Sequence, residues 1–290
     1  MTVAVIGTGR MGSAMAVRLR ESGTDVVVHN RSRASAERTG APVADTAREA
    51  AAGADTVFVS LADDKAVLSV YAGPDDLAAG LRPGVVVLET STIDPETVRM
   101  VQPLVAERDA TLLDAPVSGS VPLVQRGELT FMVGGDSAAL DKVRPTLDIL
   151  AKQVFHVGDV GAGAIVKLSV NTVVHALNAA LSEALVLAER AGVPRETTYE
   201  VFAASAIAAP FVGYKREAFV HPDTAPVAFT LDLVAKDLEL IQTLAERVGA
   251  PMRQTATTSR VVKAAIAAGL GEYDMSAIAQ FLSRGVITNS

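Results

Sequence analysis

Short runs rich in β-branched residues alternate with longer Ala-rich segments of helical periodicity through the first half of the chain. Runs of the first kind favour strands, and segments of the second kind favour helices. Their alternation is typical of a largely parallel sheet wrapped by helices. The predicted strands are Thr2–Ile6, Asp25–His29, Thr56–Ser60, Val85–Glu89, Thr111–Ala115, Thr130–Val133 and Val154–Val157. The predicted helices between them are Arg10–Ser22, Ser35–Thr39, Asp64–Val70, Pro95–Arg108 and Ser137–Leu150.

The pattern changes after Gly158, where long amphipathic periodicities replace the alternation. They lie near residues 164–192, 195–206, 229–248 and 251–269, with no convincing strand among them. We therefore predict an α/β fold, in which a doubly wound sheet over residues 1–161 precedes an all-helical domain over residues 162–290. The first helical pattern corresponds to roughly 42 Å of helix, more than a compact domain of this size needs. This length predicts that the helix spans the domain junction and supports a partner subunit.

Composition excludes several classes of protein. Hydrophobic residues make up 49% of the chain, which suffices for a buried core, and the net charge of −7 offers no basic field for nucleic acid. Cysteine is absent, which excludes disulfides and thiolate sites, and no His/carboxylate cluster has the spacing of a metal site. A strand from Thr2 leaves no room for a signal peptide, and charges interrupt the apolar stretches before the roughly 20 residues that a membrane span needs. We expect a soluble, cytoplasmic protein without a membrane partner.

Three glycines with GxGxxG spacing follow the first strand and open the first helix. In this context the first glycine allows a tight turn, the second lets a pyrophosphate approach the backbone, and the third packs helix against strand. The helix N-terminus adds free N–H groups for the phosphates. A tight turn without a ligand is the alternative, but the order strand, glycines, helix, strand favours dinucleotide binding by a Rossmann-type domain. The loop residues assigned to the cofactor are Gly7, Thr8, Gly9, Arg10, Met11 and Gly12.

The end of the second strand bears on which dinucleotide binds. An NAD site usually has an acidic residue there for the ribose hydroxyls, whereas this chain has Asn30, Arg31, Ser32 and Arg33. A guanidinium pairs with a 2′-phosphate in bidentate fashion, and Ser32 adds a hydroxyl donor. We therefore predict NADP, with NADPH preferred over NADH, and assign Asn30, Arg31 and Ser32 to it. Arg31 is the stronger candidate, because Arg33 is equally explained as the start of a solvated helix.

Two later segments carry candidate chemistry. The hydroxyl of Ser118 and the backbone N–H groups of Gly119 and Ser120, after the strand ending near Ala115, would form a small anion nest for a substrate carboxylate. A plain Ser/Gly loop explains this spacing equally well. Lys167 and Asn171 lie four residues apart in an otherwise apolar helical pattern and therefore share one helix face. A solvated lysine is the alternative explanation on spacing alone.

As a set, four motifs resemble the signatures of the β-hydroxyacid dehydrogenases: VIGTGRMGSAM, DAPVSGSVPLVQRGELTFMVGG, GAGAIVKLSVN and KDLELI. They occur in the family order and cover essentially the whole chain. The family includes 3-hydroxyisobutyrate dehydrogenases and glyoxylate/succinic semialdehyde reductases and, more distantly, 6-phosphogluconate dehydrogenases and imine reductases. The resemblance implies a Rossmann domain followed by a helical domain, assembled as homodimers or homotetramers.

The resemblance also implies roles for individual positions. Lys167 matches the catalytic lysine and Asn171 the asparagine that orients the substrate. The remaining matches are Ser118, Gly119 and Ser120 in the substrate-binding segment, Lys236 and Asp237 in the C-terminal motif that closes over the substrate, and Leu61, Ser91 and Thr92 beside the cofactor. The chain departs from the family pattern at Ser120, which replaces a second glycine in the segment expected to bind the substrate carboxylate.

Together these features predict reversible hydride transfer between NADP(H) and a small β-hydroxy acid or its semialdehyde, with Lys167 as general acid/base. An NADPH-dependent imine reductase is one alternative, although that group commonly has Asp or Tyr at the position of Lys167. A non-catalytic NADP-binding sensor is another; the presence of Ser118, Lys167, Asn171 and Lys236 together argues against it. His175 is interpreted as structural.

Overall fold

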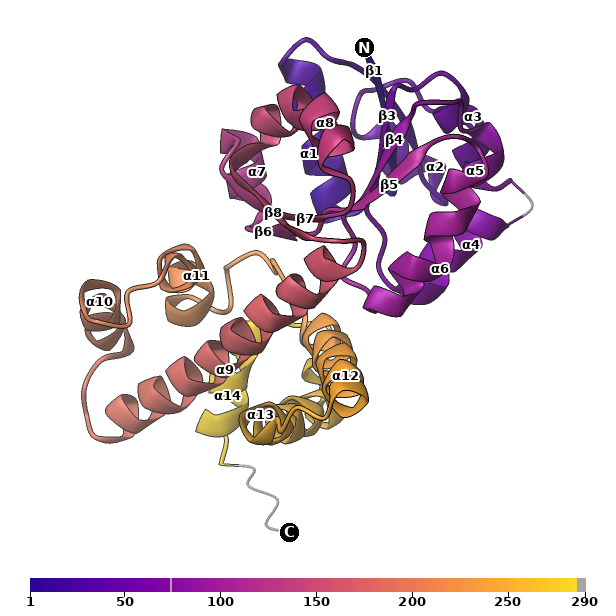
Figure 1. The fold of residues 1–290 in the computed structure, drawn as a ribbon. Coiled ribbons are helices and arrows are strands. Elements are labelled where there is room, and N and C mark those ends of the chain that lie inside the picture. Colours follow the sequence, from indigo (N-terminus) through magenta and orange to yellow (C-terminus); the bar gives the residue numbers. More distant parts are fainter. Residues whose placement is uncertain (74, 286–290) are drawn as a thin grey trace. The chain divides into compact units, whose positions relative to one another are not determined.

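The computed structural model describes residues 1–73 and 75–285 and divides the chain into two units (Figure 1). The first unit is Met1–Leu168 and the second begins at Ser169. The division falls inside the long helix α9 (Ala162–Arg190), seven residues after the boundary that the sequence predicts at 161/162. Residues 286–290 of the predicted helical domain lie outside the described residues.

The first unit contains an eight-stranded sheet. Its strands are β1 (Thr2–Ile6), β2 (Asp25–His29), β3 (Thr56–Val59), β4 (Val86–Glu89), β5 (Thr111–Asp114), β6 (Val117–Ser118), β7 (Leu129–Gly134) and β8 (Ala151–Gly158). Their order is β2-β1-β3-β4-β5-β7-β6, with β8 beside β7. Every pairing is parallel except those of β7 with β5 and β6, which confirms the predicted, largely parallel sheet.

Helices cover both faces of this sheet (Figure 1). They are α1 (Arg10–Glu21), α2 (Arg33–Glu37), α3 (Ala47–Ala52), α4 (Asp64–Ala72), α5 (Leu77–Gly80), α6 (Pro95–Ala106), α7 (Val121–Arg126) and α8 (Ser137–Leu150). Successive residues of a strand point to opposite faces, so β1 serves two cores. Val3 and Val5 pack in the cluster that contains α1 and α8, whereas Ala4 and Ile6 pack in the cluster that contains α4 and α6. The short helices α3, α5 and α7 escaped the sequence analysis because they are too short to show a helical period.

The second unit is helical. Its helices are the remainder of α9, α10 (Arg195–Ala204), α11 (Pro210–Val220), α12 (Leu231–Val248), α13 (Arg253–Ala265) and α14 (Ile278–Ser283). Over its described residues this unit has no strand beyond an isolated bridge between Thr230 and Asp274, as predicted. The same Asp274 forms a buried ion pair with Lys215, at 2.8 Å from Nζ to each carboxylate oxygen.

Helix α9 is long and apolar enough to cross a membrane by length and composition alone. One helix of this kind is weak evidence for a membrane span, because core helices of water-soluble domains meet the same criteria. It also carries buried Asn171 and Asn178, whose amides donate to Asp237 Oδ2 and to the Met275 carbonyl. These bonds are typical of a helix packed inside a polypeptide core.

Candidate active site

The glycine loop between β1 and α1 is shaped by two close backbone approaches. A Cβ atom on Gly7, which has φ +91°, would collide with the Ser60 carbonyl oxygen, and one on Gly12 would collide with the Gly7 carbonyl oxygen. By contrast, a Cβ on Gly9 would have no atom within 4 Å. The backbone is therefore tightly packed on its inner side and open beside Gly9, at the N-terminus of α1. This arrangement fits a pyrophosphate approaching the loop.

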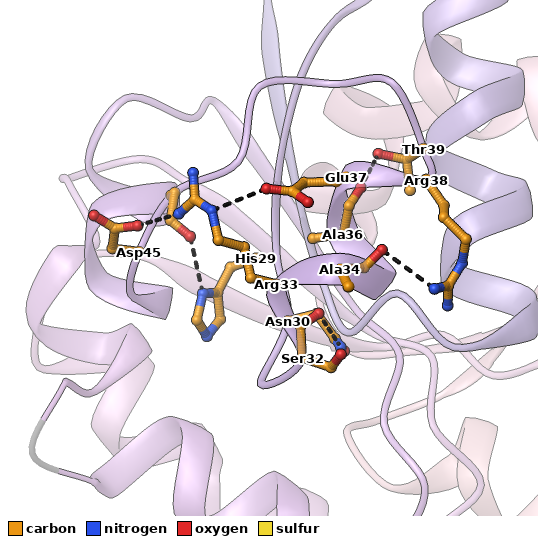
Figure 2. Close-up of polar contacts among 11 residues, drawn as sticks. His29, Asn30, Ser32, Arg33, Ala34, Ala36, Glu37, Arg38, Thr39 and Asp45 are labelled. Atoms are coloured by element: carbon orange, nitrogen blue, oxygen red, sulfur yellow. Dashed lines mark hydrogen bonds and ion pairs between the residues drawn. The ribbon is translucent and has the colours of Figure 1, made fainter.

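Asn30 connects this loop to the end of β2 through hydrogen bonds of its side chain. Its Oδ1 accepts the Thr8 N–H at 3.0 Å. Its Nδ2 donates to the Ser32 carbonyl at 3.1 Å (Figure 2). The Thr8 carbonyl in turn accepts the hydroxyls of Ser13 and Ser35, at 2.8 and 2.9 Å. Thr8 and Asn30 therefore hold the loop in place from within the protein. Arg10 is exposed and Met11 half-buried at the start of α1.

The two arginines after β2 have different surroundings. Arg33 is held by two carboxylates, with its Nε 3.1 Å from Glu37 Oε1 and its Nη1 on Asp45 Oδ1 (Figure 2). Arg31 is exposed, and over the described residues it has no hydrogen bond or ion pair. Of these two guanidinium groups, that of Arg31 therefore has no carboxylate partner among the described residues.

The loops after β3 and β4 meet through Ser91. Its Oγ accepts the Leu61 N–H at 2.8 Å, and its own N–H donates to Glu89 Oε1 at 2.9 Å. Thr92 follows, half-buried. The structure therefore brings together Leu61 and Ser91, two residues assigned to the cofactor from the sequence, and adds Glu89 behind them.

Glu89 was not among the residues predicted for the site. It ends β4 with 1% of its surface exposed, and its partner in register on the next strand is Asp114, which is fully buried. Burial, together with the charge of Asp114, raises the pKa of Glu89, while the hydrogen bonds from Ser91 and the nearby Tyr71 hydroxyl lower it; the resulting pKa is about 7. A carboxylate directly after the apolar run Val85–Leu88 is the signal that sequence reasoning could have used.

Asp114 ends β5 and reaches the first turn of α9. Its Oδ2 accepts the Ala164 N–H at 2.9 Å. Burial raises the pKa of this carboxyl, while hydrogen bonds from the backbone of Ala164, Gly161 and Gly163 act in the opposite direction. Lys167, half-buried, lies three residues beyond Ala164 on the same helix and in the same unit.

The segment after β5 differs in detail from the expectation. Gly119 has φ +141°, and a Cβ there would lie 2.6 Å from Leu129 Cδ2, so the position requires glycine. Ser120 has φ −129° and is the N-cap of α7, a conformation that any residue adopts. Both φ values lie outside the αR and αL ranges that are typical of an anion nest, and the nest stays a prediction. The segment carries two polar side chains: Ser118 is half-buried at the end of β6, and Ser120 Oγ is buried with no hydrogen-bond partner among the described residues.

In the second unit, Asn171 and the KDLELI motif come together. Asn171 Nδ2 donates to Asp237 Oδ2 at 2.7 Å, and Lys236 Nζ lies 3.0 Å from Asp237 Oδ1. His175 Nε2, one turn beyond Asn171, lies 3.5 Å from the same carboxylate. Asp237 is 1% exposed, so its carboxylate contacts Asn171 and Lys236 from the buried interior of the second unit and not from solvent.

Two family models match the chain. The NAD binding domain of 6-phosphogluconate dehydrogenase matches residues 2–158, which is more than half of the chain. The model described as NAD-binding of NADP-dependent 3-hydroxyisobutyrate dehydrogenase matches residues 161–282. The chain belongs to the β-hydroxyacid dehydrogenase family. The predicted fold of this β-hydroxyacid dehydrogenase, a Rossmann-type sheet followed by a helical domain, is confirmed.

Individual proteins agree with this assignment. The 2-(hydroxymethyl)glutarate dehydrogenase of Eubacterium barkeri is 32% identical over 279 residues, which cover 95% of this chain and 93% of that protein. Glyoxylate/succinic semialdehyde reductase 2 of Arabidopsis thaliana is 32% identical over 285 residues, with coverages of 97% and 79%. The crystal structure of 3-hydroxyisobutyrate dehydrogenase from Salmonella typhimurium has a TM-score of 0.88 at 28% identity and covers 97% of this chain and 99% of that one. This β-hydroxyacid dehydrogenase is thus an oxidoreductase with a pyridine-nucleotide-binding domain.

The raised pKa of Glu89 predicts a pH-dependent stability. Glu89 contributes its full stabilisation to the folded state at pH values below the pKa that it has in the unfolded chain. This stabilisation is lost as the pH rises through about 7, the pKa of Glu89 in the folded protein. Relative to Glu89→Gln, the free energy of unfolding of the wild type should therefore fall by about 3 kcal/mol between pH 5 and pH 8. Urea unfolding of both proteins at the two pH values measures this change. Glu107→Gln, at an exposed position, is the control, and an equal offset for Glu89→Gln at both pH values would contradict the assignment.

Proposed function

We propose that the chain is an NADP-dependent β-hydroxyacid dehydrogenase or semialdehyde reductase that uses Lys167 as its general acid/base. One observation carries this proposal: Asp114, at the carboxyl end of β5, is bonded to the first turn of α9, and Lys167 lies on the next turn. Ligands of open α/β sheets bind at the carboxyl ends of the strands, where the glycine loop also lies.

When bound, the dinucleotide supplies or accepts a hydride at its nicotinamide ring. The chain's own groups handle the proton and the orientation of the substrate. Lys167 as an ammonium donates a proton to the carbonyl oxygen during reduction, and as a neutral amine it accepts the hydroxyl proton during oxidation. Asn171, one helical turn further, holds the substrate, because its amide is fixed by Asp237 and does not titrate. Ser118 donates its hydroxyl to the substrate carboxylate.

The substrate class is supported by the relatives. Their names describe small carboxylates that carry a hydroxyl or an aldehyde group. We propose the same class for this chain and test it by following nicotinamide absorbance with a panel of β-hydroxy acids, semialdehydes and cyclic imines. Turnover of hydroxy acids or semialdehydes is expected. Faster turnover of the imines would instead support an imine reductase, and no turnover of any compound would support a non-catalytic sensor.

Arg31 should determine the preference for NADPH. Arg31→Ala removes a guanidinium that would pair with the 2′-phosphate, a charged contact whose loss weakens binding by about 10- to 100-fold. Fluorescence titration is expected to show this loss for NADPH and almost no change for NADH. Arg33→Ala is the matched control, because its guanidinium is already held by Glu37 and Asp45. Equal NADH and NADPH affinities in the wild type would refute the proposed preference.

Lys167 should be essential for turnover and dispensable for cofactor binding. Lys167→Ala is expected to lower kcat by about 10²- to 10⁴-fold, since it removes the proton donor and acceptor, while the Kd for NADPH stays within about twofold. Lys167→Arg keeps the positive charge but cannot deprotonate, so hydroxy acid oxidation should remain equally impaired. Lys152→Ala, on exposed β8, is the control. Near wild-type turnover in Lys167→Ala would exclude the proposed mechanism.

A further inference from the structure

The Asp114 carboxylate is buried, has no assigned role in the chemistry and joins two segments that the proposed function uses. We propose that Asp114 is a positioning residue, which sets the location of Lys167 through the first turn of α9 and that of Ser118 through the backbone after β5. This inference rests on the proposed function, because it needs Lys167 and Ser118 to act on a substrate.

The Asp114 carboxylate packs tightly against the first turn of α9 and against the end of β7. Its Oδ2 accepts the Ala164 N–H at 2.9 Å. A Cβ on Gly163 would lie 2.9 Å from that oxygen and 2.5 Å from the Met132 carbonyl oxygen, and a Cβ on Gly134 would collide with Oδ1. Two glycines therefore leave the space that the carboxylate fills. This packing explains why glycine occupies position 163 in the GAGAIVK stretch.

The helix transmits this contact to Lys167. The first N–H groups of a helix have no partner within it, and an acceptor at the N-terminus prevents the first turn from fraying. An anion also interacts favourably with the positive end of the helix dipole. Lys167 follows Ala164 by three residues, or about 4.5 Å along the axis. A first turn that frays would therefore release the residue that carries the lysine.

The backbone at Asp114 leads into the second segment, the one that carries Ser118. Asp114 is the last residue of β5, and the next N–H, that of Ala115, donates to the Glu89 carbonyl at 2.7 Å. Pro116 then accepts the Met132 N–H at 3.0 Å, and β6 with Ser118 follows directly. The direction of this short segment is thus set by the strand end whose side chain holds α9. Asp114 thus connects Lys167, the proposed acid/base, with Ser118, the proposed ligand of the substrate carboxylate.

A substitution series separates accepting a hydrogen bond from carrying a charge. Asp114→Asn and Asp114→Ser keep an oxygen acceptor, whereas Asp114→Ala does not. If Asp114 positions Lys167, kcat should fall by about tenfold or more in Asp114→Ala, since small displacements of a reacting group are costly. It should fall less in the Asn and Ser variants. The Kd for NADPH should stay within about twofold in all three.

A matched control tests whether the loss is merely structural. Asp136 caps α8 of the same unit in the same manner, with its Oδ1 accepting the Ala139 N–H at 2.7 Å. Asp136→Ala removes an exposed helix cap and should leave kcat unchanged. Hydrogen exchange adds a readout independent of turnover: amides 162–168 should exchange faster in Asp114→Ala and not in Asp136→Ala.

The outcomes distinguish this inference from the proposed function. Wild-type kcat in Asp114→Ala, with Lys167→Ala inactive, would overturn the positioning role alone. Equal kcat losses in the Asn, Ser and Ala variants, or a loss of NADPH affinity as large as the loss of kcat, would overturn it too. An active Lys167→Ala would overturn the proposed function itself. If Asp114→Ala does not fold, Gly163→Ala is the second variant, because its Cβ would lie 2.9 Å from Asp114 Oδ2 and displace the contact. Wild-type kcat together with wild-type exchange at 162–168 in that variant contradicts the inference.

Discussion

The hydrogen bond from the Ala164 N–H to the Asp114 carboxylate links the sheet to the helix on which the proposed chemistry depends. A helix N-terminus needs acceptors, and a buried carboxylate needs donors, so each satisfies a requirement of the other. The glycines around the contact follow from it, because no larger residue fits beside the carboxylate. The first turn of α9 is therefore held to the sheet by a buried polar contact as well as by the apolar packing of Ala164.

Asp114 and Glu89 are neighbours in register at two adjacent strand ends, and both are buried. The charge of Asp114 disfavours the ionised form of Glu89 and so raises its pKa, in addition to the effect of burial. The difference lies in their donors: Asp114 is surrounded by backbone N–H groups, whereas Glu89 has the Ser91 N–H and the nearby Tyr71. Proton occupancy at Glu89 is thus tied to the loop that holds Ser91 and Leu61.

The fold was predictable where the signal is local. The glycine spacing, the period-2 strands and the length of α9 depend on neighbouring residues, and each appears in the structure. The roles of Asp114 and Asp237 were not predictable, because each carboxylate meets a partner 50 or 66 residues away in sequence. Arg33 illustrates the same limit: its spacing suggested a phosphate ligand or a solvated helix start, and only the fold brings Asp45 to it. The backbone dihedrals at Gly119 and Ser120, on which the expected anion nest depends, are likewise not encoded in a Ser/Gly pattern.

Lys167 and Asn171 lie on either side of the division between the two units but on one uninterrupted helix. Their separation along the axis is therefore about 6 Å, set by helix geometry and independent of any rearrangement of the units. The helix backbone therefore fixes the spacing of these two positions. It also fixes where the two side chains begin, so inserting one residue between them would turn one away from the other by about 100°.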